Sequence, residues 1–174
     1  KGPANPNAIY SVWAGANDLF YQLGLAQAGL VTPAEVQANL ATAATQNVQL
    51  VAALRAGGAQ TIIVFNLPDI GKTPFGVGSG QAAQISALSS LYNSVLGAGL
   101  DAAGIPTIRV NAFGFLNELI ANPGKYGFLN ASTPACGATP SLLCTPANLV
   151  TPQAAQTYVF ADGVHPTTAM HAII

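Results

Sequence analysis

The chain has 174 residues, which suits one folded domain and is long enough to bury a sizeable core. Hydrophobic residues make up 51% of it and charged residues only 6%, with a formal net charge of −1. Its five Lys and Arg residues are too few for a surface that tracks nucleic-acid phosphates or for a polybasic membrane patch, so we expect no nucleic-acid partner.

Short runs rich in β-forming residues alternate with longer segments of helical spacing. The predicted strands cover residues 8–13, 61–65 and 107–110, and the predicted helices cover about 33–56, 81–103 and 115–120, with a last helix starting at Pro166. The first helix has the clearest start, because Thr32 suits the N-cap, Pro33 the first helical position and Glu35 a capping box. The order of elements, without an internal repeat, predicts a single α/β domain over residues 1–174 with a parallel sheet.

The remaining segments are expected to be irregular. The predicted loops are residues 15–18 and 66–80, and a longer excursion over 124–151 precedes a very short extended piece at 158–160. The strand at 61–65 has no apolar–polar alternation, which is typical of a parallel strand covered on both faces. The strand at 8–13 has no helix before it, so we expect its outer edge to be bare in this chain.

Asp162 and His165 carry the strongest chemical signal. A carboxylate three residues before a histidine, with Gly163 between them, can fold back onto the ring and accept the proton of Nδ1. That arrangement leaves Nε2 free to act as a general base. The spacing fits a structural role equally well, in which Asp162 caps the last helix and His165 is a neighbour of the cap.

Asn17 is the second candidate for chemistry. It follows a strand and Gly15, so its amide can point into the cleft at the carboxyl end of the strand, where ligands bind in open α/β sheets. A neutral side-chain NH₂ is a good donor to a developing oxyanion. Taken alone, the position favours a simpler interpretation, an Asx-turn at the end of the strand.

Cys136 and Cys144 lie in one loop rich in Pro, Thr and Gly. Because the chain also carries so few charges, we favour a short-loop disulfide in an exported protein over two free thiols. A zinc site needs about four ligands. The two cysteines are the only ones in the chain and both histidines lie elsewhere, so we expect no metal and no other cofactor.

Three segments, taken in order, resemble a known family. Residues 15–18, Gly-Ala-Asn-Asp, resemble the GxND block of the SGNH or GDSL hydrolase superfamily, and residues 162–166 resemble its DxxHP block. Residues 65–74 are similar to a segment common in bacterial GDSL lipases and esterases. The resemblance spans nearly the whole chain and is strongest to a subgroup that includes secreted esterases and the passenger domains of autotransporters.

The resemblance implies a flavodoxin-like three-layer αβα sandwich with a five-stranded parallel sheet. It also implies ester hydrolysis by a Ser-His-Asp triad through an acyl-serine, without a cofactor. His165 would be the base, Asp162 its orienter and Asn17 an oxyanion donor, with Gly15 leaving room for the tight turn. The substrate would be an ester or a lipid, and the protein would be secreted or located at the bacterial outer membrane or cell surface.

The sequence departs from the family pattern in one respect, because it contains no Gly-Asp-Ser block. Ser11 lies in the first strand, and Ser79 lies in the glycine run at 76–80, which has no nucleophile elbow. We therefore expect the C-terminal larger part of the domain, with its N-terminal strand or strands missing and the nucleophilic serine in an upstream segment or a separate chain. The alternatives are a non-catalytic αβα module for binding or adhesion, and a nucleotide-binding domain, for which residues 76–80 lack the P-loop Lys.

Overall fold

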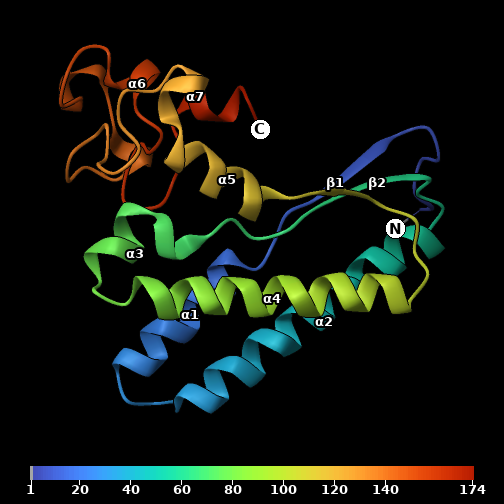
Figure 1. Ribbon diagram of the computed structural model, residues 1–174. Coiled ribbons are helices and arrows are strands. Elements are labelled where there is room, and N and C mark those ends of the chain that lie inside the picture. Colours follow the sequence, from blue (N-terminus) through green and yellow to red (C-terminus); the bar gives the residue numbers. More distant parts are fainter. Residues whose placement is uncertain (1) are drawn as a thin grey trace. The chain divides into compact units, whose positions relative to one another are not determined.

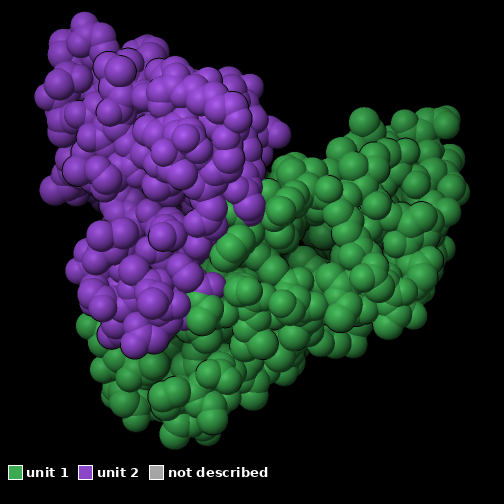
Figure 2. Space-filling view, in the orientation of Figure 1, with its two compact units in different colours: residues 1–68, 87–113 green, residues 69–86, 114–174 purple. Residues whose placement is uncertain are grey.

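The computed structural model describes residues 2–174, and the chain divides into two compact units (Figures 1 and 2). Unit 1 holds the described residues up to 68 together with residues 87–113, and unit 2 holds residues 69–86 and 114–174. Each unit is described by itself.

Unit 1 is built around a parallel sheet of three strands, β1 (Ile9–Val12), β2 (Thr61–Phe65) and β3 (Ile108–Val110), in the order β1-β2-β3. The predicted α/β class is confirmed. The five strands implied by the resemblance are not found in the described residues, because the extended piece at 158–160 forms only isolated bridges, Asn130 with Tyr158 and Phe160 with Pro166. In the same residues β1 pairs on one side only, as expected of a bare edge.

Two long helices of unit 1, α2 (Pro33–Ala56) and the part of α4 (Ala82–Ala102) that follows residue 86, lie on one side of the sheet (Figure 1). The chain steps from β1 to β2 to β3 in one direction, and right-handed crossovers then place both connecting helices on the same face. Leu40, Val51 and Leu100 are fully buried there, and each such side chain contributes about 1.5–3 kcal/mol.

The start of α2 is the one that the sequence predicts. Thr32 is its N-cap, Pro33 is its first residue, and the Thr32 hydroxyl accepts the Glu35 N–H at 3.3 Å. The Glu35 carboxylate in turn accepts the Thr32 N–H at 2.7 Å, which completes the capping box.

The burial of β2 differs from the expectation of a strand covered on both faces. Ile62 and Val64 are 1% and 3% exposed, whereas the alternate residues Thr61, Ile63 and Phe65 are only half-buried. The β-branched run hides this alternation, because an Ile or Val occupies both kinds of position. Burial here follows from which face the helices cover, which the residue types alone do not specify.

Unit 2 contains shorter elements around its own core. Its helical segments are η1 (Ile70–Lys72), α3 (Pro74–Gly78), the first residues of α4, most of α5 (Ala112–Ala121), η2 (Pro123–Tyr126), η3 (Ser141–Leu143), η4 (Pro146–Asn148), α6 (Ala154–Thr157) and α7 (Thr168–His171). Its core gathers Leu116, Leu119, Phe128, Val159, Phe160 and Met170.

Two predicted boundaries in unit 2 are wrong for a shared reason, which is a threonine cap. The segment at 66–80 is not one loop, because Thr73 caps α3 and accepts the Gly76 N–H at 3.1 Å. The last helix starts at Thr168 rather than Pro166, because Thr167 caps it and accepts the Met170 N–H at 3.2 Å.

No helix in the described part of the chain combines the length and the apolar character that crossing a membrane requires.

Candidate active site

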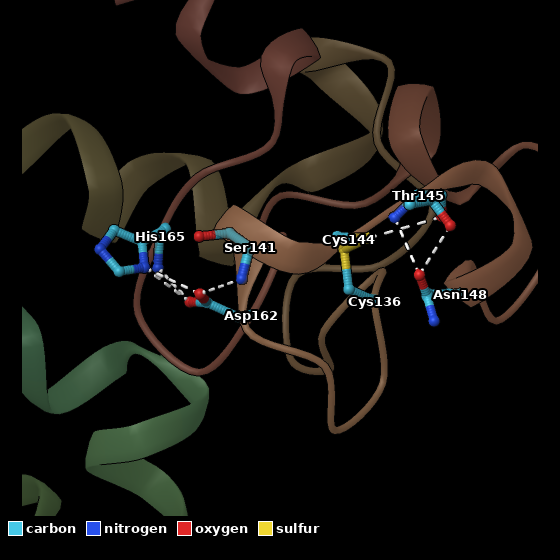
Figure 3. Close-up of a disulfide and its surroundings, with 7 residues drawn as sticks. All are labelled: Cys136, Ser141, Cys144, Thr145, Asn148, Asp162 and His165. Carbon is cyan, nitrogen blue, oxygen red and sulfur yellow. Dashed lines mark hydrogen bonds and ion pairs between the residues drawn. A yellow bond between two sulfur atoms is a disulfide. The ribbon is translucent and has the colours of Figure 1, made fainter.

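Asp162 and His165 meet within unit 2, as their spacing predicts. The Nδ1 atom of His165 lies 2.8 Å from Oδ2 and 2.9 Å from Oδ1 of Asp162 (Figure 3). The carboxylate also accepts the peptide N–H groups of His165 at 2.8 Å and of Val164 at 3.0 Å, so the turn folds around it. A further N–H, from Ser141, reaches Oδ2 at 2.8 Å from a segment 21 residues away.

These contacts keep Asp162 charged. Burial acts to raise the pKa of Asp162, but the peptide N–H groups of His165, Val164 and Ser141, with the His165 ring, together hold this pKa well below its ordinary value. A carboxylate that accepts the Nδ1 proton fixes the tautomer in which Nε2 carries a lone pair. Figure 3 shows this second nitrogen pointing away from Asp162, and the His165 side chain is 63% exposed. The exposed Nε2 can therefore accept a proton from a group that reaches it from solvent.

The sequence also allowed a purely structural role for Asp162 and His165, and one part of that interpretation is wrong. The cap of α7 is Thr167, so Asp162 does not cap the last helix. The carboxylate organises its own turn instead. Gly163 in this turn accepts the N–H of Phe75 at 2.8 Å, which ties α3 to the loop that holds the pair.

Gly15 and Asn17 belong to unit 1 and do not form a loop. Gly15 is the N-cap of α1 (Ala16–Gln27), and Asn17 is an exposed residue of its first turn. Sequence reasoning missed this helix because its N-cap is a glycine with no side-chain cap, so the usual Ser, Thr, Asp or Asn signal is absent. An amide at the start of a helix lies beside the backbone N–H groups that favour negative charge, which suits an oxyanion donor.

Gly15 is required at its position for two reasons. Its φ of 115° is one that other residues rarely adopt, and a Cβ there would lie 2.3 Å from Cζ of Tyr92. The Tyr92 hydroxyl donates to the Ala14 carbonyl at 3.0 Å and accepts from Asn47 at 3.1 Å. Burial raises the pKa of the Tyr92 phenol, and the hydrogen bond from Asn47 offsets part of this. Tyr92 thus fixes the start of α1.

Asp69, in the segment that resembles GDSL lipases, has a structural role in unit 2. It is 3% exposed and accepts the Ser86 hydroxyl at 2.5 Å and the Asn117 side-chain amide at 3.0 Å. The Ser86 hydroxyl is therefore engaged, and the Ser79 hydroxyl donates to the Gly76 carbonyl at 2.7 Å. Neither contact involves His165, whose ring is hydrogen-bonded to Asp162 within the described residues.

Cys136 and Cys144 form a disulfide in unit 2 (Figure 3). The bridge closes the loop that carries η3, and its position beside Asp162 could not be predicted from the separation of the two cysteines.

Comparison with known proteins gives the family. A family model described as GDSL-like lipase/acylhydrolase matches residues 2–174. An uncharacterized protein in the trpE-trpG intergenic region of Pseudomonas putida is 32% identical over 176 residues, which cover 98% of this chain and 28% of that protein. The esterase EstA of Pseudomonas aeruginosa is also 32% identical over 176 residues, covering 98% of this chain and 26% of EstA.

A plant relative matches a shorter part. The GDSL esterase/lipase APG of Arabidopsis thaliana is 31% identical over 132 residues, which cover 67% of this chain and 37% of that protein. The chain thus spans between 26% and 37% of the length of these relatives. The chain belongs to the GDSL-like lipase/acylhydrolase family, and the predicted membership is confirmed.

Proposed function

We propose that this chain supplies the general base and its orienting carboxylate to a serine ester hydrolase. The observation that carries the proposal is the contact between Asp162 and Nδ1 of His165, at 2.8 Å, with Nε2 left available. Family membership and relatives named as esterases support the same reaction class.

In the proposed reaction, His165 Nε2 takes the proton of a serine hydroxyl while the serine oxygen attacks the ester carbonyl. His165 then passes the proton to the departing alcohol, and an acyl-serine remains. Water, deprotonated by the same nitrogen, releases the acid and restores the serine. Asp162 stabilises the imidazolium formed in both halves, and the Asn17 amide donates to the carbonyl oxygen as it becomes negative.

The nucleophile in this proposal lies outside residues 1–174. The chain has no Gly-Asp-Ser block. Two serines of unit 2, Ser79 and Ser86, direct their hydroxyls to Gly76 and Asp69 instead. We propose that the serine belongs to an upstream segment or a separate chain that completes the hydrolase domain together with residues 1–174.

The proposed location is outside the cytoplasm, either secreted or at the bacterial cell surface. The Cys136–Cys144 disulfide and the 6% charged composition support this, because disulfides persist in oxidising compartments. Protein taken from its native compartment and alkylated before reduction should show the two cysteines joined when non-reduced peptides are measured by mass spectrometry. Alkylated cysteines in that sample would contradict the proposed location.

The experiment that tests the function compares two histidines in the intact protein. His165→Ala should lower kcat on a panel of short- and long-chain esters by about 10³-fold or more, as in other triads. His171→Ala is the matched control, because His171, on α7, contacts the carbonyl of the N-cap residue Thr167 and has no proposed role in the reaction. Turnover of the control should stay near that of the unchanged protein. Equal turnover in both variants would exclude His165 as the base, and an intact protein that hydrolyses no ester would favour the binding module.

A further inference from the structure

The loop closed by the disulfide is anchored next to Asp162. On one side, Ala135 and Cys136 donate their N–H groups to the carbonyls of Phe160 and Ala161, at 2.8 and 2.9 Å. Ala135 and Cys136 are 1% and 4% exposed, so this anchor is buried. Asp162 follows Ala161 directly. The segment that carries the sulfur of Cys136 is therefore held against the residues that immediately precede Asp162.

The other end of the loop carries the donor. Ser141 is the first residue of η3, so its N–H has no partner inside the helix and is free to bond elsewhere. It reaches Oδ2 of Asp162 at 2.8 Å, and Cys144, which follows η3 directly, is bonded to Cys136 (Figure 3). The bridge thereby ties the segment that presents the N–H to the buried anchor.

The donors divide unequally between the two carboxylate oxygens. Oδ1 accepts the N–H groups of Val164 and His165, which belong to its own turn. The only peptide N–H that the described residues give to Oδ2, which also lies 2.8 Å from Nδ1 of His165, is that of Ser141. The placement of this oxygen therefore depends on a residue outside the turn.

We propose that the main-chain N–H of Ser141, held in place by the Cys136–Cys144 disulfide, is a positioning group for the catalytic pair. It holds Oδ2 of Asp162 at the position where this oxygen accepts the Nδ1–H of His165. The inference rests on the proposed function of His165 as the base. The lowered pKa of Asp162, to which the Ser141 N–H contributes, agrees with it.

The test removes the N–H and keeps the loop. Ser141→Pro is suited to this, because proline is tolerated at the first position of a helix and because Pro140, with φ −56° and ψ 143°, already has the extended backbone that a following proline requires. The Leu143 N–H to Pro140 carbonyl and Cys144 N–H to Ser141 carbonyl bonds do not involve the lost donor. Ser141→Ala is the matched variant, because it removes the hydroxyl and retains the N–H.

Two readouts are measured on the intact protein. Nitrogen-15 NMR reports which ring nitrogen of neutral His165 carries the proton, and it does so without turnover. In Ser141→Pro the fraction protonated on Nδ1 should fall and kcat should drop by about 10-fold, the effect of one lost hydrogen bond to a charged group. In Ser141→Ala the tautomer should stay that of the unchanged protein.

A second arm tests the bridge. Cys136→Ala/Cys144→Ala should shift the tautomer in the same direction as Ser141→Pro, because the loop is no longer tied to its anchor. Dithiothreitol, which gives two electrons and two protons to the bridge and closes into a cyclic disulfide, should reproduce the shift in the unchanged protein. It should have no further effect on the double alanine variant, which has no disulfide to reduce.

The outcomes separate this inference from the proposed function. A tautomer that is the same in Ser141→Pro and Ser141→Ala would overturn the positioning role, whatever the esterase activity. A tautomer that shifts in an intact protein without esterase activity would support the positioning of the pair while refuting the hydrolase. If the bridge variants leave the tautomer unchanged but Ser141→Pro shifts it, the part of the inference that concerns the disulfide is wrong.

Discussion

Asp162 accepts four hydrogen bonds, three from peptide N–H groups and one from the His165 ring. All four favour the charged carboxylate over the protonated acid, and they outweigh the opposing effect of burial. Three of the four donors come from residues 164 and 165, so the sequence Asp-x-x-His builds most of this environment within one turn. The proposed catalytic pair is consequently coupled to the stability of the fold.

The first prediction concerns this coupling and pH. The pKa of Asp162 is lower in the folded chain than its ordinary value, so the unfolded chain binds more protons between the two values and stability rises with pH across that interval. The contribution of Asp162 should be complete above the ordinary pKa of an aspartate, near 3.8, and should be lost as the pH falls below it towards the folded pKa.

Urea unfolding of the unchanged protein and of Asp162→Asn from neutral pH down to acid measures this contribution. The free-energy difference between the two proteins should shrink on acidification. A difference that stays constant with pH would mean that the carboxylate charge does not stabilise the fold.

The second prediction concerns Asn17. Removal of one oxyanion donor typically lowers kcat by about 10²–10³-fold. Asn17→Ala in the intact protein should show this loss with a smaller change in KM, because the donor acts on charge that develops in the transition state. Asn39→Ala on α2 is a suitable control, since its side chain bonds Gln22 on the surface. A change in KM alone would mean that Asn17 only holds substrate.

At the scale of elements, the start of α1 depends on a contact between distant segments. Gly15 caps the helix in a left-handed conformation, and the Tyr92 ring on α4 occupies the space where a Cβ would be. Helices that start at Ser or Thr, such as α2, do not need such a partner, because the cap is a hydrogen bond to their own backbone.

The third prediction compares two glycines at α1. Gly15→Ala should lower the free energy of unfolding by at least about 1 kcal/mol, because alanine is strained at positive φ and its Cβ collides with Tyr92. Gly24→Ala, in the exposed interior of the same helix with open space around its Cα, should instead raise it by about 0.5–1 kcal/mol. Urea denaturation measures both. Equal effects at the two positions would show that the Tyr92 contact does not hold the start of the helix.

At the scale of the whole molecule, the residues with proposed roles are distributed over both units. Gly15 and Asn17 belong to unit 1, and Asp162 and His165 belong to unit 2. The serine that the reaction requires belongs, in our proposal, to neither of them. The complete proposed triad can therefore be tested only in the intact protein.

The fourth prediction locates that serine. A fluorophosphonate probe reacts with a serine whose hydroxyl is activated by a neighbouring base, and peptide mapping identifies the labelled residue. In the intact protein the label should be found on a serine outside residues 1–174, and His165→Ala should abolish it. Stoichiometric labelling of Ser79, Ser86 or another serine within residues 1–174 would show that this chain carries its own nucleophile.

The sequence by itself determined the features that depend on neighbours a few residues apart. The capping box of α2 joins residues three apart, and residue type and spacing were sufficient to predict it. Asp162 meets His165 across the same separation, and there the spacing predicted the contact as one of two possibilities. The parallel α/β arrangement was also predictable, because β-branched runs alternate with segments of helical spacing.

Only the tertiary structure decided what depends on packing between distant segments. The Ser141 N–H reaches Asp162 across 21 residues, and Tyr92 reaches Ala14 across 78, yet nothing in the local sequence marks either donor. The covered face of β2 and the glycine-capped start of α1 also depend on packing between distant segments. The reason is physical: a main-chain N–H is present at almost every residue, and only the folded path of the chain determines which of them meets a given carboxylate or carbonyl.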